Sequence, residues 1–203
     1  MKEISLYIHE EEAKVSKYLS TLLQSEIVEK RMTFMGNQKS VYYEIEDTLL
    51  RFYFQFIFHE QERIRYNGDI VYKESEERIN DFISHGFEEV CSLYLEELNQ
   101  RGELGTVFPK TKNFKADKSK LGRSIEIDGV ATASGSLLIM ECKYKNSKFT
   151  KAMLEHLKES ASIFSENLAR VYCIFAKSGF EDTLSEDSSL RLFDLERMFA
   201  ENK

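Results

Sequence analysis

The sequence predicts a mixed α/β domain in which helices pack against a central β-sheet. Three stretches support this fold class. Residues 124–145, S-I-E-I-D-G-V-A-T-A-S-G-S-L-L-I-M-E-C-K-Y-K, predict two strands joined by a turn at residues 133–136. Residues 148–168 predict an amphipathic helix. Residues 170–176, R-V-Y-C-I-F-A, form a continuous apolar run of strand length, as expected of a strand buried on both faces.

The bulk composition sets limits on size and partners. The chain has 203 residues, enough for one large domain or for a small domain joined to a medium one. A hydrophobic content of 42% supports a packed core, and 31% charged residues suit a soluble protein. The net charge of -7 argues against a wholly basic protein that coats nucleic acid, but it leaves room for a local basic path.

Cysteine usage and the absence of a targeting pattern predict a cytoplasmic protein. Cys91, Cys142 and Cys173 stand far apart among apolar neighbours, without C-x-x-C spacing or a paired histidine. We therefore expect three reduced, mostly buried thiols, with neither a zinc site nor a disulfide framework. The sequence shows no signal peptide and no apolar run near about 18 residues, so we expect no membrane partner.

Residues 1–45 predict part of a winged helix-turn-helix. A helix at 10–24, a strand at 27–31, a turn at 36–39 and a strand at 40–45 make its back half. Such a module contacts DNA through its recognition helix and wing, or serves in packing and protein contacts instead. The run Glu10-Glu11-Glu12 suits a helix N-terminus but disfavours a phosphate backbone.

Residues 46–85 predict a helical connector. Aromatic and aliphatic side chains cover nearly the whole circumference of a helix at 46–59, which predicts burial on most sides. Base stacking is the less favoured interpretation, because Arg51 is the sole basic residue within this helix. Residues 61–73 are polar and predict a linker or short helical turn, and residues 74–98 predict a long helix with a break near 84–86.

Residues 86–203 predict the main domain, with the element order α-β-β-β-α-β-α. The first helix spans 86–100, the first strand spans 104–108, and a helix at 190–199 ends the domain. A basic segment, which contains a single acid, Asp117, precedes the predicted hairpin. We expect this segment either to contact nucleic-acid phosphates or to form a solvated loop. Its basic residues are Lys110, Lys112, Lys115, Lys118, Lys120 and Arg123.

The hairpin carries charged groups within otherwise apolar strands. Asp128 lies on the first strand, and Glu141 and Lys143 lie on the second, where a period of two places both on one face. Burying such groups is costly unless they pair or bind a ligand. Asp128 and Glu141 could share Mg²⁺ or Mn²⁺, with the backbone carbonyl of Cys142 as a further ligand. Lys143 could then orient or deprotonate an attacking water.

The residues alone leave two questions undecided: which further carboxylate joins the site, and whether the charged groups bind a metal or pair with each other. Glu88 or Glu89, near the start of the preceding helix, could supply another carboxylate. The alternative to a metal site is a salt-bridged pair of Glu141 and Lys143 on a half-exposed strand, with Asp128 beginning a turn. The spacing D-x(12)-E-x-K is short and permissive, so it does not decide between them.

Several sequence blocks resemble the PD-(D/E)xK restriction-endonuclease-like superfamily, whose core has the order α-β-β-β-α-β. Within it they resemble the C-terminal domain of archaeal and bacterial AAA-type ATPases, which follows a winged helix. The blocks are F-E-E-V-C at 87–91, E-I-D-G-V-A at 126–131, E-C-K-Y at 141–144 and F-A-K-S-G-F at 175–180. Y-E-I-E-D-T-L-L-R-F-Y-F-Q-F-I at 43–57 resembles the segment that joins the two domains.

The resemblance implies a restriction-endonuclease-like fold with a mixed central sheet, and a nuclease site at Glu88, Asp128, Glu141 and Lys143. It implies Mg²⁺ or Mn²⁺ as cofactor, and it implies DNA and an ATPase module in cis or in trans as partners. The protein could also form a homodimer. The chain lacks G-x-x-x-x-G-K-[ST], and Ile127 stands where the superfamily motif has proline. The ATPase relatives tend to carry a pair of aromatic residues before the acidic strand, and this pair is not evident here, since the chain has no tryptophan.

Three hypotheses about function follow. The first is a metal-dependent deoxyribonuclease-like domain that binds DNA and is accessory to an AAA-type ATPase. The second is a catalytically silent module that binds DNA or protein and regulates such an ATPase. The third is a purely structural interaction domain that binds neither metal nor DNA.

Overall fold

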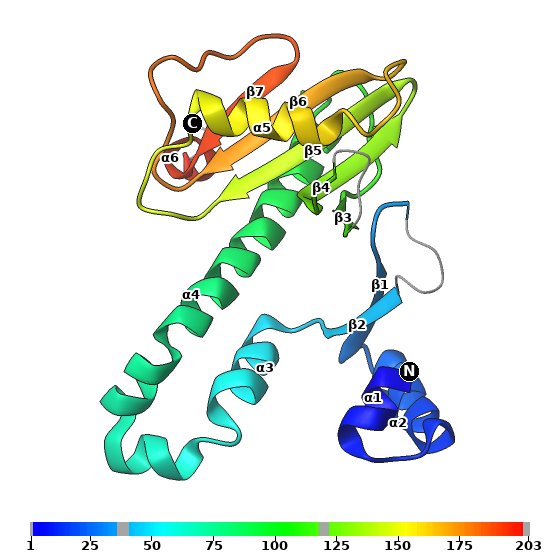
Figure 1. Ribbon diagram of the computed structural model, residues 1–203, viewed down its shortest axis with the longest axis vertical. Helices are drawn as coiled ribbons and strands as arrows, with labels where there is room; N and C mark the ends of the chain where they lie inside the picture. Colours follow the sequence, from blue (N-terminus) through cyan, green and yellow to red (C-terminus); the bar gives the residue numbers. More distant parts are fainter. Residues whose placement is uncertain (1, 36–40, 118–121, 201–203) are drawn as a thin grey trace. The chain divides into compact units, whose positions relative to one another are not determined.

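A computed structural model describes residues 2–35, 41–117 and 122–200, and it confirms the mixed α/β class (Figure 1). The chain divides into two compact units. The first contains Met1–Met32 and Gly36–Arg78, and the second contains Thr33–Met35 and Ile79–Lys203. The predicted limits of the three domains, at residues 45 and 85, remain predictions.

The first unit begins with helix α1 (Lys2–Ile8) and helix α2 (Glu12–Gln24). Strands β1 (Val28–Met32) and β2 (Val41–Ile45) follow and pair antiparallel. The helix and both strands therefore lie within a few residues of their predicted positions. The turn predicted at 36–39 lies outside the described residues.

The aromatic segment differs from the single buried helix that the sequence predicts. It forms a short helix α3 (Thr48–Phe52), capped by the Asp47 carboxylate, and a π-helical turn η2 (Tyr53–Ile57). In this segment Phe56 is buried under the Arg78 guanidinium, 5.3 Å from its ring centroid, whereas Leu49 is 75% exposed. The prediction of burial on most sides was wrong, because the small first unit covers one side of an apolar helix rather than its whole circumference.

Helix α4 (Gln61–Gln100) contains the residues that the sequence assigned to a linker at 61–73. The predicted break at 84–86 is also wrong, since the helix continues through Gly86. Its one kink lies at Asn67, with φ −158° and ψ 84°. There the Asn67 side chain accepts the N–H of Ile70 at 3.3 Å, so it restarts the helix as a cap does.

The second unit is built on a five-stranded mixed sheet, in the order β3-β4-β5-β6-β7. Strands β3, β4 and β5 pair antiparallel, and β5, β6 and β7 pair parallel. Helix α5 (Lys151–Ala161) connects β5 to β6, and helix α6 (Leu195–Phe199) follows β7. The strands are β3 (Lys112–Ala116), β4 (Ile125–Ala133), β5 (Ser136–Lys143), β6 (Ala169–Ala176) and β7 (Leu190–Asp194).

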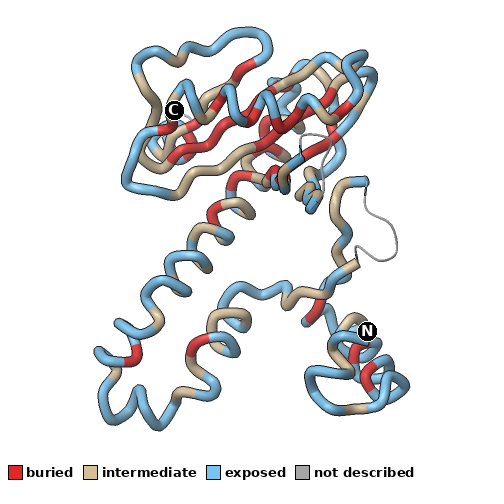
Figure 2. The backbone as a smooth tube through the Cα atoms, viewed as in Figure 1, coloured by how far each residue is buried: buried red, intermediate tan, exposed pale blue. Residues whose placement is uncertain are grey.

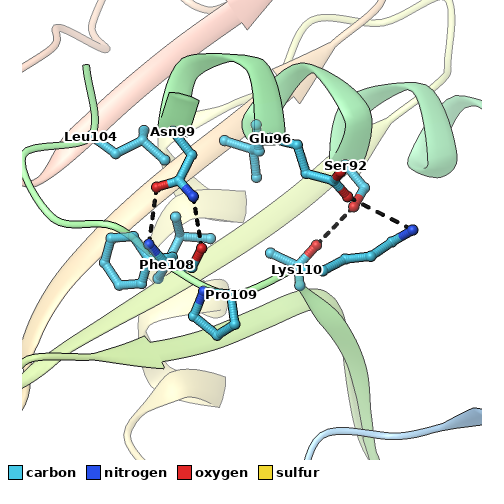
Figure 3. Close-up of a pocket in the computed structure, with 10 residues that line it drawn as sticks. Ser92, Glu96, Asn99, Leu104, Phe108, Pro109 and Lys110 are labelled. Atoms are coloured by element: carbon cyan, nitrogen blue, oxygen red, sulfur yellow. Dashed lines mark hydrogen bonds and ion pairs between the residues drawn. The ribbon is translucent and has the colours of Figure 1, made fainter. Parts of the chain in front are cut away.

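Two predicted elements of this unit are corrected. Residues 104–108 are not a strand, because the Asn99 amide bonds both the N–H and the carbonyl of Phe108, at 2.9 and 2.7 Å (Figure 3). A side chain on α4 thus replaces a partner strand. The first half of the helix predicted at 190–199 is β7, since Leu190 and Phe193 are buried against the sheet.

The sheet has two apolar faces, and Figure 2 shows that buried residues gather in its strands. One face packs under α5 and includes Leu137, Ile139 and Ile174. The other packs under α4 and includes Leu138, Met140 and Phe175. Because β5 is covered on both faces, any polar side chain near its end must find a partner or a ligand.

Candidate metal and nucleic-acid site

The open end of the β4–β5 hairpin positions the predicted carboxylates. The strands pair from Ala133 and Ser136 at the turn to Gly129 and Met140, where the ladder ends. Beyond it, the Asp128 carboxylate accepts the backbone N–H of Cys142 at 2.8 Å. A side chain therefore satisfies a strand N–H at the point where the two backbones stop pairing.

Gly129 allows this close approach. A Cβ at this position would lie 2.9 Å from Met140 Cε and 3.1 Å from Thr111 Cβ, which is too close for ordinary contacts. On the other side of β4, the register with β3 shifts between Lys112 and Phe114. At this bulge Asp128 and Gly129 together stand opposite one β3 residue, Asn113.

Burial and neighbouring negative charges make both carboxylates weak acids. Burial raises the pKa of Asp128 to about 7, with a further contribution from the charge of Glu88, and the hydrogen bond from Cys142 opposes this rise. Burial and the charges of Asp128 and Glu88 raise the pKa of Glu141 to about 8. The charge of Glu126 acts on both in the same direction. A cation at this end of the hairpin would relieve the repulsion.

Glu141 and Lys143 do not form the salt bridge that was the alternative to a metal site. Within the described ranges, the Glu141 carboxylate has neither a hydrogen bond nor an ion pair. The Lys143 ammonium donates instead to the carbonyl of Lys148 at 2.7 Å and contacts Met153 Sδ at 3.2 Å. The ammonium is therefore held beside α5, while the carboxylate has no partner among the residues that the structure describes.

An open pocket of about 320 Å³ lies between this end of the hairpin and α5. Glu141 lines it together with two ionisable side chains that the sequence did not point to, Glu126 and His156. Glu126 could have been found, since it stands two residues before Asp128. His156 could not, because only the packing of α5 against the sheet brings it near the hairpin. The remaining lining residues are Ala152, Met153, Leu157 and Ser160.

Helix α4 contributes further ionisable groups. Glu88 lies 3.2 Å from Nδ1 of His85, and its charge raises the pKa of both hairpin carboxylates. Within the described part of the chain, Glu88, Asp128 and Glu141 do not converge on a single set of ligand atoms within 4.8 Å. Glu88 still acts on both hairpin carboxylates through its charge.

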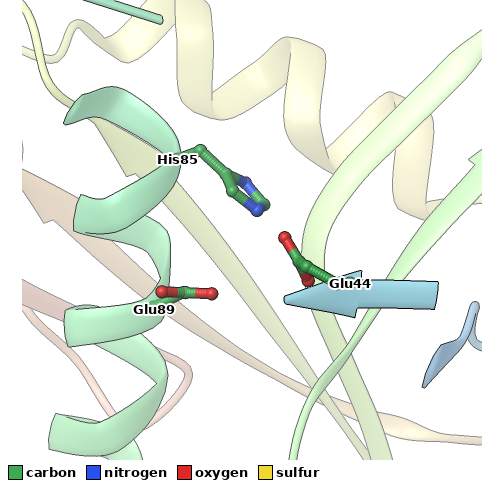
Figure 4. Close-up of side chains that lie close together, drawn as sticks. All are labelled: Glu44, His85 and Glu89. Carbon is green, nitrogen blue, oxygen red and sulfur yellow. The ribbon is translucent and has the colours of Figure 1, made fainter. Parts of the chain in front are cut away.

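A histidine and a second carboxylate also stand on α4. His85 and Glu89 lie one turn apart and project from the helix in Figure 4. Glu44, drawn with them, belongs to β2. Within the first unit its two oxygens contact Arg51 Nη1 at 2.7 Å and Arg31 Nη1 at 2.9 Å.

Four of the six predicted nucleic-acid-binding residues are described, and Lys118 and Lys120 lie outside the described residues. Lys115 pairs with Glu126 at 2.6 Å, and Arg123 contacts Glu159 at 3.0 Å and Ser160 Oγ at 3.1 Å. Lys110 lies 3.7 Å from Glu96, beside a water-sized hollow against α4 (Figure 3). Lys112 is exposed at the start of β3. Surface ion pairs of this kind contribute little to stability.

The three cysteines are free thiols, in agreement with the predicted absence of a disulfide framework. Cys142 and Cys91 contact each other through their side chains. Burial, and then this contact, raises the pKa of the Cys142 thiol well above its ordinary value. Among the helices of the described ranges, none combines the length and apolar character that a membrane crossing requires.

Comparisons with other proteins identify a family. Residues 53–157 match DUF234, a family described as archaeal and bacterial proteins of unknown function. No curated protein matches the chain significantly. One solved structure, titled crystal structure of protein of unknown function AF1548, aligns with a TM-score of 0.32 and 17% identity. The alignment covers 51% of this chain and 59% of the other, so the chain spans less than two thirds of that protein.

Proposed function

The chain belongs to the DUF234 family, and we propose that it is a metal-dependent, nuclease-like domain that binds DNA. The observation that carries this proposal is the pair of carboxylates at the open end of the β4–β5 hairpin. Glu141 has no protein partner within the described ranges, and the pKa of both carboxyls is raised, chiefly by burial. Such a pair is destabilising unless it is protonated or neutralised by a cation.

The donor set suits a hard divalent cation such as Mg²⁺ or Mn²⁺. Asp128 and Glu141 offer carboxylate oxygens, and the Cys142 carbonyl stands between Glu141 and Lys143 in the chain. Glu88 would act on the bound metal through its charge or through a bridging water. When bound, the metal would polarise the phosphate and lower the pKa of a water.

The other residues of the site have roles that follow from their charge. In phosphodiester hydrolysis, water adds to phosphorus and the leaving oxygen takes up a proton. The Lys143 ammonium, now held by the Lys148 carbonyl and Met153, would orient that water or stabilise the phosphate charge. Lys110, Lys112, Lys115, Lys118, Lys120 and Arg123 would follow the nucleic-acid backbone.

Action with an AAA-type ATPase, in cis or in trans, forms part of the proposal. Its support is the sequence resemblance at residues 43–57 and 126–144, together with an order of α4-β3-β4-β5-α5-β6 that fits the expected core. A homodimer is also compatible with the proposal. Neither partner bears on the chemistry of the hairpin.

A cleavage assay tests the proposed activity. Purified protein with Mg²⁺ or Mn²⁺ is expected to cleave linear, branched or single-stranded DNA, and Glu141→Ala should abolish cleavage while the protein stays folded. If all three substrates stay intact with both metals, and Glu141→Ala behaves as the wild type does, the catalytic proposal is wrong.

The second candidate function is a catalytically silent module that binds DNA or a protein. The hydrogen bond that occupies the Asp128 carboxylate, and the contacts that hold Lys143, favour it over catalysis. Salt-sensitive DNA binding without cleavage, weakened by neutralising Lys112, Lys115 and Lys118, would support this function. Calorimetric titration with Mn²⁺ separates both functions from a purely structural domain, which would take up neither metal nor DNA.

A further inference from the structure

The pocket between the hairpin and α5 has a rim of cations. Each of three residues that line it contacts a basic side chain. Glu126 pairs with Lys115 at 2.6 Å, Ser160 accepts a hydrogen bond from Arg123 at 3.1 Å, and Met153 contacts the Lys143 ammonium at 3.2 Å. These cations come from three separate parts of the sequence, which are β3, the residues just before β4 and the end of β5, and each contacts a residue that lines this pocket.

The wall of the pocket has the opposite character. Glu141 and Glu126 contribute carboxylates, and Glu141 lacks a protein partner within the described ranges. His156 is the sole imidazole among the lining residues. Its ring is exposed and has no hydrogen bond or ion pair to the described residues. The pocket therefore offers carboxylates for a cation and an imidazole for a hydrogen bond, and basic side chains contact three of its lining residues.

We propose that this pocket seats one phosphodiester group of a nucleic-acid strand, and that His156 donates a hydrogen bond to it. The inference rests on the proposed function, because an anion beside two glutamates needs a divalent cation between them. With the cation on Glu141, the phosphate lies between the metal and the imidazole. Lys115, Arg123 and Lys143 balance its remaining charge, and the open pocket has room for it.

The geometry distinguishes this role from that of a metal ligand. Within the described part of the chain, Glu126, Glu141 and His156 do not bring their ligand atoms within 4.8 Å of one another. These three residues therefore do not form one compact set of ligands, and His156 lines the pocket as a group that can contact the substrate. Its place on α5, one turn after Met153, fixes it relative to β5 because Leu154 and Leu157 of the same helix are buried in the core.

Binding of the dinucleotide thymidylyl-(3′,5′)-thymidine in the presence of Ca²⁺ tests the inference without relying on cleavage. The chain has four histidines, so the imidazole C–H signals can be assigned by substitution. The dinucleotide is expected to shift the His156 signals. His156→Ala should weaken dinucleotide binding about tenfold, the loss expected for one hydrogen bond to a charged group. Lys158→Ala, a charge removed from α5 outside the pocket, should bind as the wild type does.

Two measurements keep this inference separate from the proposed function. Titration with Mn²⁺ alone tests the metal site, and His156→Ala should bind Mn²⁺ with wild-type affinity. If Mn²⁺ does not bind the wild type, the proposed function is wrong, and the inference is wrong with it. Suppose that Mn²⁺ binds, but the dinucleotide does not shift the imidazole signals of His156 or binds His156→Ala as tightly as the wild type. In that case only the proposed phosphodiester site is wrong. His156 is exposed, so its removal should leave the thermal unfolding temperature unchanged.

Discussion

The two ends of the β4–β5 hairpin are built from the same two strands but differ in how their polar groups are satisfied. At the turn, Ser134 and Gly135 take positive φ angles of 48° and 79°, and the backbone ladder is complete up to Ala133 and Ser136. At the other end, the ladder stops at Gly129 and Met140, and a carboxylate takes the place of a backbone acceptor.

The difference shows where this protein gains stability and where it holds reactive groups. Leu137 and Leu138, next to the turn, are almost fully buried, one on each face of the sheet. Asp128 and Glu141, at the open end, carry charges that burial makes unfavourable. Truncating a buried side chain at the closed end should therefore lower stability without affecting ligand binding, whereas substituting Asp128 or Glu141 should change ligand binding and the dependence of stability on pH.

The largest expected effect lies at the closed end. Leu137→Ala removes a fully buried side chain and should destabilise the protein by about 2–5 kcal/mol, through lost burial and the cavity left behind. Chemical denaturation measures this change. Leu93→Ala is a matched control, since Leu93 is 60% exposed, and should cost about 0.5 kcal/mol or less. Folded Leu137→Ala should still bind Mn²⁺, and loss of metal binding in its folded state would contradict the separation of the two ends.

The second effect is a pH dependence located at the open end. In the folded protein, the pKa of Asp128 is raised to about 7 and that of Glu141 to about 8, against values near 4 in the unfolded chain. The stability that these protonated groups contribute is full below about pH 4 and is lost as the pH rises through 7 and 8. The metal-free protein should thus lose on the order of a few kcal/mol between pH 5 and pH 9.

Glu141→Gln checks the source of this loss. The amide cannot ionise, so the variant should be more stable than the wild type at pH 9 without metal, and its stability should vary less with pH. Glu155→Gln, an exposed acid on α5, serves as the control and should follow the wild type. Excess Mn²⁺ should restore stability to the wild type at high pH but not to Glu141→Gln. A wild-type profile that is flat from pH 5 to pH 9 would contradict the burial of these carboxyls.

A smaller effect is expected where the two strands approach most closely. Gly129→Ala places a Cβ against Met140 and Thr111, and overpacking of this kind should cost about 1–3 kcal/mol. Gly86→Ala is the matched control, since nothing lies within 4 Å of its added Cβ and alanine favours the helix by about 1 kcal/mol. Thermal unfolding compares the two. Equal stability of both variants would mean that β4 and β5 can separate at the open end without cost.

The smallest effect is a gain at the turn. Ser134 has a φ of 48°, which asparagine adopts more readily than serine does. Ser134→Asn should therefore stabilise the hairpin by about 0.5 kcal/mol. Denaturation at a pH where the carboxyls are protonated isolates this change from the open end. A loss of stability would indicate that the serine has a role beyond the turn.

Much of the second unit was predictable because local patterns there agree with the tertiary structure. The alternation of residues 124–145 and the apolar run at 170–176 predicted β4, β5 and β6 within a few residues. The helical spacing of 148–168 predicted α5, but the helix ends at Ala161, seven residues earlier than predicted. The misses at 104–108 and 190–199 share one cause. In both, a tertiary contact decided the backbone conformation, the Asn99 amide in one case and pairing with β6 in the other.

The first unit was harder to predict because little of it is packed. An apolar helix can be buried all round or partly exposed, and the residues 46–59 do not distinguish these outcomes. The kink at Asn67 rather than near Gly86 likewise depends on a side-chain hydrogen bond, which has no periodic signature. The polar segment at 61–73 became helical as part of α4.

The sequence alone determined the identity and order of the chemical groups. Asp128, Glu141 and Lys143 stand in strands whose period of two fixes which of them share a face, and covalent spacing decides this before any folding. The tertiary structure decided which groups meet. Among the described residues it left Glu141 without a partner, and it held Lys143 against α5. It also brought His156 into the same pocket as Glu141, because only packing brings these residues together.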